Sequence, residues 1–139
     1  RQMCIRDRYK RGVFALDTAL FLHDLTDRTP HKFHMAFPYG YNTSSPKAAG
    51  ILCSCKKEPY YSLGIALVDT PAGNTVRVYN AEKTLCEILK PISHTDIQII
   101  TDAFKRYAGR KDKNIPLLSE YAHQLRVEKR LRPYLEVLL

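Results

Sequence analysis

The segment 73–90, GNTVRVYNAEKTLCEILK, constrains the fold most, because a strand pattern gives way to a helix pattern within it. Val76 and Val78 alternate with their neighbours, the period of two expected for a strand with one buried face. Asn80 then predicts the N-cap of a helix, since its side-chain oxygen can accept a hydrogen bond from a backbone N–H of the first turn. We therefore expect a strand that ends at Tyr79 and leads directly into a helix.

The predicted helix has an apolar face formed by Leu85, Ile88 and Leu89, which recur at positions i, i+3 and i+4. Glu82 adds negative charge to the first turn, where it interacts favourably with the helix dipole. Pro91 ends the pattern because proline cannot continue the hydrogen-bond ladder. The other elements are expected to be arranged around this strand and helix.

The first half of the chain contains three further strand patterns. They cover residues 33–37, 51–56 and 65–68. The turn at 69–74, DTPAGN, predicts an antiparallel hairpin with a longer loop between the last of these strands and the strand that ends at Tyr79.

Helix patterns lie before and after these strands. After a short apolar stretch at 13–15, Asp17 or Thr18 is expected to cap a helix that ends near Leu25, whereas the loop 39–50 is expected to be irregular. The C-terminal part predicts three helices, over 97–108 with Gly109 as C-cap, over 117–125 and over 127–138. Pro133 is expected to kink the last helix or to start a fresh turn.

Hairpin strands followed by a run of helices indicate an α+β fold. We expect a mixed or antiparallel sheet of about four strands, followed by a packed set of C-terminal helices. With 139 residues, of which 45% are hydrophobic, the chain suits one domain, expected to cover residues 9–139. Residues 1–8 are expected to be a non-native leader, because RQMCIRDR has no clean helical or strand period.

The chain is strongly basic, with 22 Lys and Arg residues against 14 Asp and Glu residues and a formal net charge of +8. This charge favours an acidic partner, with nucleic acid foremost. Two groups of basic residues are candidates for phosphate contacts, although a solvated surface with cations at a helix end explains them equally well. They are Lys105, Arg106, Arg110, Lys111 and Lys113 in the first group, and Arg126, Lys129, Arg130 and Arg132 in the second.

No catalytic residue, metal site or cofactor is expected. The five histidines lack metal-ligand spacing, and His23 is interpreted as a hydrogen-bonded residue at the edge of the core. A magnesium-dependent nuclease would need an E-x-K motif on a strand, but Glu82 and Lys83 are consecutive and lie in a helix, so Asp69 has no companion.

The four cysteines do not have the spacing of a zinc site either. Cys53 and Cys55 would share one face of a strand, but no second Cys/His pair accompanies them. Together with Cys4 and Cys86 they are expected to be buried or half-buried thiols. No apolar run has the length of a membrane span, so we expect a cytoplasmic protein without a membrane partner.

Three segments of the chain, HDLTDRTP, MAFPYGYN and GNTVRVYNAEKTLCEIL, resemble a known family. The family is the C-terminal domain of the AbiEi-type antitoxins of bacterial type IV toxin–antitoxin systems, which act in abortive defence against phage. The resemblance runs from about residue 10 to residue 139. Its motif residues are Asp17, Ala19, Leu20, His23 and Leu25, then Phe37, Pro38, Gly40 and Tyr41, and finally Val78, Tyr79, Glu82, Lys83, Thr84, Leu85 and Cys86.

The chain departs from the family pattern at three places. Asp24 stands where the family usually has glycine, which is expected to loosen the turn after the helix. Glu87 replaces the usual Asp and is expected to shift a local hydrogen bond. Family members carry an N-terminal winged helix-turn-helix, and none precedes Tyr9, so the chain is expected to be a truncated antitoxin.

The resemblance implies a non-enzymatic antitoxin that counteracts a nucleotidyltransferase-like toxin. In its full-length form such a protein is a DNA-binding transcriptional regulator that represses its own operon, and it contacts operator DNA mainly through the missing N-terminal domain. Two alternatives stay open. One is a divergent nuclease or other DNA-processing enzyme, and the other is a scaffold domain of a transcriptional regulator.

Overall fold

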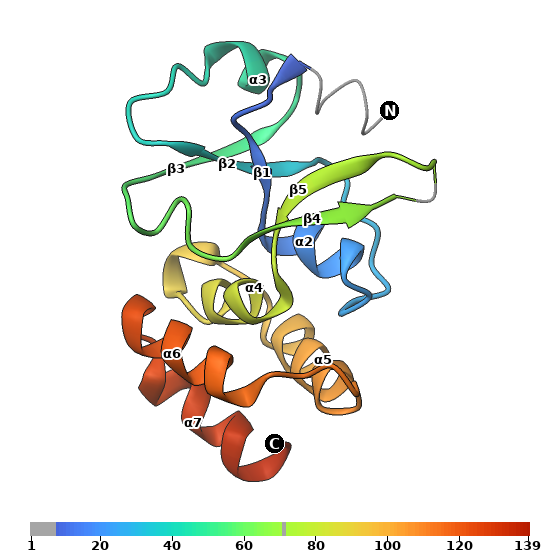
Figure 1. Cartoon of the computed structure of the whole chain (residues 1–139), viewed down its shortest axis with the longest axis vertical. Coiled ribbons are helices and arrows are strands. Elements are labelled where there is room, and N and C mark those ends of the chain that lie inside the picture. Colours follow the sequence, from blue (N-terminus) through green and yellow to red (C-terminus); the bar gives the residue numbers. More distant parts are fainter. Residues whose placement is uncertain (1–7, 71) are drawn as a thin grey trace.

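The computed structural model describes residues 8–70 and 72–139, and it places a five-stranded mixed sheet at one end and the C-terminal helices at the other (Figure 1). The order of the strands across the sheet is β3-β2-β1-β5-β4. The strands are β1 (Val13–Phe14), β2 (His34–Pro38), β3 (Leu52–Lys56), β4 (Ile65–Asp69) and β5 (Thr75–Tyr79).

The two-residue strand β1 lies at the centre of the sheet and joins its two halves. It pairs antiparallel with β2, with Val13 opposite Ala36, and parallel with β5, with Phe14 opposite Val78. The sequence patterns predict about four strands and do not reveal β1, because an alternation of buried and exposed residues cannot be recognised in a strand of two residues. The sheet is mixed, since β2 and β3 are parallel whereas β4 and β5 form the predicted antiparallel hairpin.

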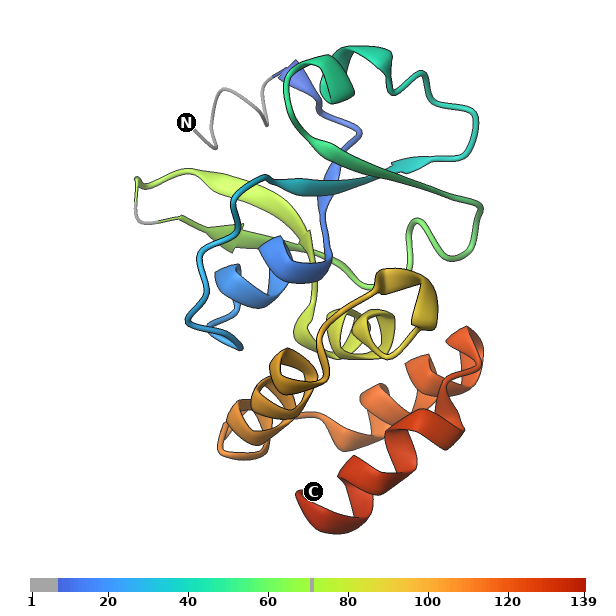
Figure 2. The same ribbon diagram turned by 180° about the vertical axis from the view of Figure 1, so that it is seen from behind.

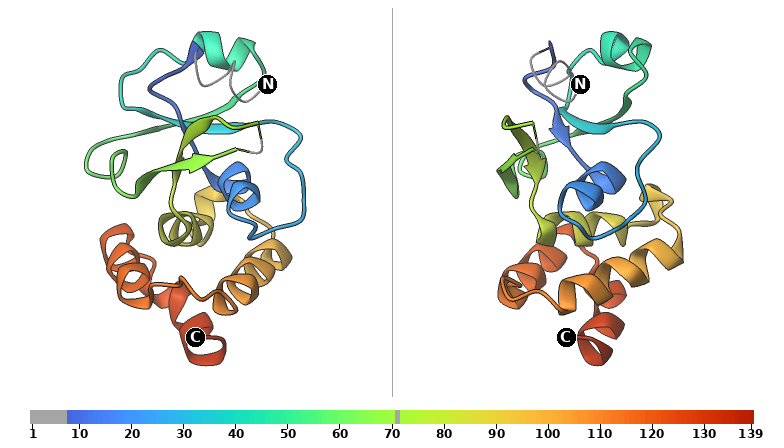
Figure 3. Two further views of the ribbon diagram at one scale, coloured as in Figure 1. Left: turned by 45° about the vertical axis from the view of Figure 1, so that its right-hand side comes forward. Right: turned by 90° about the vertical axis from the view of Figure 1, so that its right-hand side faces the viewer.

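The helices complete the predicted α+β fold. The central helix α4 lies between the sheet and the outer helices, and α2 lies beside it under the same side of the sheet (Figure 3). The helices are α2 (Leu16–Leu22), α3 (Ser44–Ala48), α4 (Ala81–Ile88), the short 3-10 helix η1 (Pro91–Ser93), α5 (Ile97–Ala108), α6 (Ile115–Leu125) and α7 (Glu128–Val137).

The start of α4 is formed as the sequence predicts. Asn80 is its N-cap, and the Oδ1 atom of Asn80 accepts a hydrogen bond from the backbone N–H of Lys83 at 2.8 Å. The apolar face packs in the main core, where Leu85 belongs to the same buried cluster as Phe104 of α5 and Leu118 of α6. The opposite face of α4 is buried as well, because the sheet and the loop 57–64 cover it, so all eight residues of this helix are shielded from solvent.

Two local predictions for the first half of the chain are wrong. The N-cap of α2 is Ala15, whereas Asp17 and Thr18 lie inside the first turn, where the hydroxyl of Thr18 accepts a hydrogen bond from the backbone N–H of His34 at 2.9 Å. The loop 39–50, expected to be irregular, contains the helix α3. This helix is anchored by tertiary contact, since Tyr9 and Ser45 share a hydrogen bond of 3.1 Å between their side chains.

The C-terminal helices follow the predicted order. Gly109 is the C-cap of α5 as expected, and α7 continues through Pro133. Within the described residues, none of the helices has the length and apolar character needed to cross a bilayer. The predicted leader 1–8 lies outside the described residues except for Arg8, and so does Cys4.

Candidate functional site

The backbone carbonyl of Tyr79, where β5 passes into α4, gathers side chains from distant parts of the chain. It accepts a hydrogen bond from His23 Nε2 at 2.8 Å and from the hydroxyl of Thr84 at 3.3 Å. Because a carbonyl only accepts, the Nε2 atom of His23 carries the proton. Burial lowers the pKa of His23 and favours the neutral ring. The prediction that His23 is a hydrogen-bonded residue at the edge of the core is confirmed.

Lys83 is fully buried beside this junction. Its Nζ atom donates to the carbonyls of Tyr60 at 2.8 Å and Leu63 at 3.0 Å, and it lies 3.7 Å from the centre of the Tyr79 ring. Burial lowers the pKa of Lys83 to about 8, and the nearby Glu87 carboxylate opposes this shift. Lys83 therefore fastens the loop 57–64 onto α4.

Glu87, one turn further along α4, is also buried. Its Oε2 atom lies 2.6 Å from Lys56 Nζ on β3, and its Oε1 atom lies 3.9 Å from Lys83 Nζ and makes no hydrogen bond among the described residues. The carboxylate thus stands between two cations, one from the sheet and one from its own helix. This arrangement ties β3 to the central helix.

Glu82, a third charged residue of α4, faces the C-terminal helices. Its Oε2 atom accepts a hydrogen bond from the Tyr107 hydroxyl at 2.6 Å, and the same hydroxyl accepts from the backbone N–H of Asn114 at 2.6 Å. Burial and the hydrogen bond to Glu82 both raise the pKa of Tyr107. Glu82 therefore connects α4 to α5 and to the start of α6, a role that no signal in the sequence indicated.

Two turns contain the motif residue Gly40 and Asp24, one of the positions that depart from the motif. Gly40, after Pro38, has a φ of 88°, and Tyr41 stacks on Phe37 with ring centres 4.6 Å apart. Asp24 has a φ of 58°, in the left-handed region that glycine adopts without strain.

The first basic group is largely engaged within the protein. The guanidinium of Arg106 lies 2.9 Å from Asp102, and that of Arg110 forms two hydrogen bonds to Asp112 at 2.9 and 2.8 Å. Arg110 also donates to the carbonyl of His23 at 2.8 Å, and its hydrogen bonds to Asp112, together with its charge, lower the pKa of Asp112. Lys113 donates to the carbonyl of Ala108 at 2.7 Å.

The other basic residues are exposed and have no ion-pair partner in the part of the chain that the structure describes. They are Lys105 and Lys111 from the first group, and Arg126, Lys129, Arg130 and Arg132 from the second. The two groups lie at opposite ends of α6, which has 11 residues and so spans about 16 Å at 1.5 Å per residue. The helices α5 and α7, which carry Lys105 and Arg132, also contact each other, because Phe104 stacks on Tyr134 with ring centres 4.3 Å apart.

A polar hollow that sequence analysis missed lies between β3 and the segment from α4 to α5. It has a volume of about 720 Å³ and is lined by Lys56, Lys90 and Glu87, among others. His34 and Ser54 line it too, and they share a hydrogen bond of 2.6 Å between their side chains. No signal in the sequence could have found this hollow, because its lining comes from six separate elements, α2, β2, β3, α4, η1 and α5.

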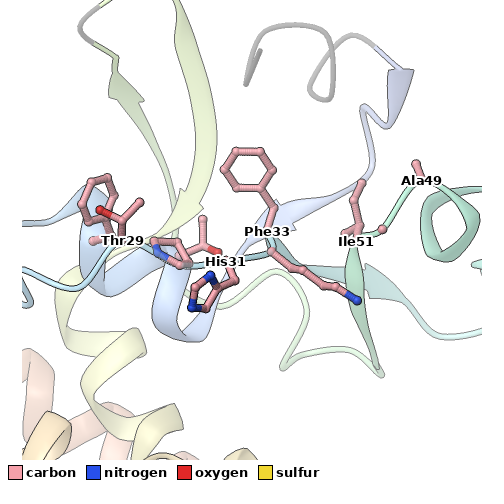
Figure 4. Close-up of a pocket in the computed structure, with 10 residues that line it drawn as sticks. Thr29, His31, Phe33, Ala49 and Ile51 are labelled. Atoms are coloured by element: carbon pink, nitrogen blue, oxygen red, sulfur yellow. The ribbon is translucent and has the colours of Figure 1, made fainter.

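A second hollow, of about 570 Å³, lies beside β2 and the start of β3 (Figure 4). The labelled side chains Thr29, His31, Phe33, Ala49 and Ile51 point in different directions and do not converge on one point. None of the lining residues forms an ion pair in the described part of the chain. Its lining combines the polar residues Thr18, Thr29, His31 and Lys32 with apolar residues such as Phe33 and Ile51.

The cysteines only partly follow the prediction of buried or half-buried thiols. Cys86 is buried, its pKa is raised by burial to about 12, and its thiol faces the carbonyl of Leu118 at 3.6 Å. Cys53 is half-buried, but Cys55 is exposed, because it lies on the edge strand β3. Within residues 8–70 and 72–139, no group of three or more His, Cys, Asp or Glu side chains is placed to hold a metal ion.

Comparison with known proteins adds no relative. No protein-family model matches the chain, and a search of curated proteins returned no match.

Proposed function

We propose that this domain is the antitoxin part of a type IV toxin–antitoxin system and counteracts a nucleotidyltransferase-like toxin without being an enzyme itself. The full-length protein would repress its own operon and contact operator DNA mainly through a further N-terminal domain. The proposal places the protein in the cytoplasm, where toxin and operator are found.

The observation that carries this proposal is the meeting of the motif residues at Tyr79. His23 lies 56 positions before Tyr79, yet it shares the Tyr79 carbonyl with Thr84, while Lys83 lies over the Tyr79 ring. Thr84 and Lys83 lie within five positions of Tyr79, so the contact from His23 is the one that joins two distant motifs. This contact supports the resemblance to the AbiEi antitoxins.

The two turns support the same family. Asp24 has the left-handed conformation that favours glycine, the residue that the family usually carries there. Glycine at position 40 has the same kind of backbone, with a φ of 88°. The departure at Asp24 thus keeps the geometry of the turn, since Asp tolerates this region better than most residues do.

A binding role without catalysis fits the chemistry of α4. Glu82 is engaged by Tyr107, and Lys83 donates to two carbonyls, so these residues serve the core instead of facing solvent. Asp69, at the end of β4, lies on the hairpin away from both of them. A cleavage assay with magnesium or manganese and plasmid or RNA tests this, and specific cleavage that Asp69→Ala abolishes would overturn it.

The exposed basic residues are proposed to add a weak contact to DNA that is independent of its sequence. Lys105 and Lys111 on one side and Arg126, Lys129 and Arg130 on the other can each neutralise a phosphate. Such contacts add affinity but read no base, so recognition of an operator is assigned to the N-terminal domain.

The test of the proposed function is growth of cells that express a cognate toxin of the nucleotidyltransferase-like type. Co-expression of residues 9–139 should restore growth. Persistent arrest in cells that hold soluble, folded domain would refute the proposal.

A further inference from the structure

Two exposed tyrosines and three lysines form a surface beside the polar hollow, which we call the tyrosine–lysine surface. Tyr39 is 69% exposed and Tyr60 is 39% exposed. Lys57 Nζ lies 4.8 Å from the centre of the Tyr39 ring, and Lys90 Nζ lies 5.9 Å from the centre of the Tyr60 ring. Lys56, next to Lys57, is the third lysine.

The fold holds this surface through backbone contacts. The N–H of Tyr39 donates to the carbonyl of Lys56 at 2.9 Å, and the carbonyl of Tyr60 accepts from the buried Lys83. The loop 57–64 that carries Tyr60 runs beside η1 and the end of α4 (Figures 1 and 2). The two tyrosine rings are therefore partly exposed, each with a lysine beside it, while their backbones are held in place.

The polar hollow continues from this surface, because Lys56 and Lys90 line both. Inside it, the side chains of His34 and Ser54 share a hydrogen bond of 2.6 Å, and those of Ser93 and Thr95 share one of 3.0 Å. The edge of a base would enter by exchanging one of these hydrogen bonds for its own.

The acidic groups near this surface are partly neutralised. Glu87 stands between Lys56 at 2.6 Å and Lys83 at 3.9 Å. Glu58, in the loop itself, accepts hydrogen bonds from the backbone and hydroxyl of Ser62. Asp17 and Asp96 also line the hollow, on the side of α2 and α5.

We propose that the tyrosine–lysine surface binds single-stranded nucleic acid. Exposed aromatic rings stack on unpaired bases, lysines beside them neutralise the phosphates, and the hollow admits one base. A duplex hides the faces of its bases, so it cannot use the two rings. This binding is independent of the proposed antitoxin function and of the basic groups at the ends of α6.

The experiment measures the binding of fluorescently labelled oligouridylate, oligothymidylate and a duplex, each about ten nucleotides long, within the range of known single-strand sites. The whole chain should bind both single strands more tightly than the duplex. The difference in affinity between oligouridylate and oligothymidylate then shows whether RNA or DNA is the preferred ligand. Tyr39→Ala and Tyr60→Ala should each weaken this binding roughly tenfold, since each removes one stacking platform. Tyr39→Phe and Tyr60→Phe keep the ring and should bind as the wild type does.

Two further variants keep the test independent of folding defects in the alanine variants. Lys57→Ala with Lys90→Ala should make the salt dependence of single-strand binding shallower. Arg28→Ala with Lys32→Ala removes two exposed cations from the segment between α2 and β2 and should leave that salt dependence unchanged. Tighter binding to the duplex, unaltered binding in both tyrosine-to-alanine variants, or a loss confined to the Arg28 and Lys32 variant would each overturn the proposal.

Discussion

Gly64 and Lys83 approach each other so closely that a Cβ atom on Gly64 would lie 2.7 Å from the Cβ atom of Lys83. Gly64 also has a φ of 81°, and its carbonyl accepts from the backbone N–H of Asn80 at 2.8 Å. The end of the loop 57–64 is thereby pressed against the first turn of α4. The sequence gives no sign that these two residues touch, yet their contact fixes how the hairpin meets the helix.

Gly64→Ala should therefore destabilise the protein by about 2–4 kcal/mol, from a strained positive φ and from overpacking against Lys83. Gly73→Ala is the matched control, because Gly73 has a φ of 84° but no atom within 4 Å of the added Cβ. It should cost only about 1 kcal/mol. Urea unfolding of both variants checks this, and equal losses would show that the close approach is relaxed at little cost.

Asn80→Ala should destabilise the protein by about 0.5–2 kcal/mol, because it removes the N-cap of a buried helix. Asn80→Asp keeps the oxygen that accepts from Lys83 and removes only the donor that lies 3.3 Å from the Tyr121 hydroxyl. It should lose clearly less stability. Thermal or urea unfolding of the two variants decides between them, and a larger loss for Asp would contradict the assigned cap.

Stability should fall as the pH drops below about 6.5, the value of an unperturbed histidine. Burial lowers the pKa of His23 and of His34 in the folded state, so the unfolded chain binds protons more readily in this range. Their contribution is fully present above pH 6.5 and is lost as the pH falls through the folded pKa. Each group contributes at most about 1.4 kcal/mol per pH unit.

Urea unfolding between pH 5.5 and 7.5 measures how the free energy of unfolding changes with pH. This window lies about one pH unit or more above the usual pKa of carboxylates, so their titration contributes little. His23→Gln should make the slope shallower. A slope that this substitution leaves unaltered would exclude His23 as a source.

Salt-dependent binding to duplex DNA should arise from the exposed cations, not from the paired arginines. Arg126→Ala combined with Lys129→Ala and Arg130→Ala should make the slope of log affinity against log salt shallower by about 0.9 for each phosphate contact that is lost. Operator and scrambled duplexes should bind equally.

Arg110→Ala serves as the contrast, because this residue is held by Asp112 and by the carbonyl of His23. It should lower stability more than it changes the salt slope. If binding is insensitive to salt, or the triple variant keeps the wild-type slope, the basic residues are only a solvated surface.

The sequence predicted those elements whose signals are local. Asn80 marks the start of α4 because a cap is defined within one turn, and the hairpin of β4 and β5 follows from two strand patterns around one turn. The helix α3 was missed because its anchor, the contact of Ser45 with Tyr9, spans 36 positions.

The polar contacts of the core could not be predicted for a related reason. Lys83 and Glu82 carry charges that normally face solvent, so a sequence pattern places them outside. Their burial depends on the carbonyls of Tyr60 and Leu63 and on the hydroxyl of Tyr107, which only the folded chain brings to them. The polar hollow was missed for the same cause, since its residues meet only in three dimensions.

Antitoxin activity is the central proposal, and growth under a fixed level of a cognate nucleotidyltransferase-like toxin tests it most directly. Expression of residues 9–139 should restore growth in proportion to the amount of folded domain, so Gly73→Ala should rescue nearly as well as the wild type and Gly64→Ala should rescue less. Unrelieved arrest at every level of soluble, folded wild-type domain would contradict the account.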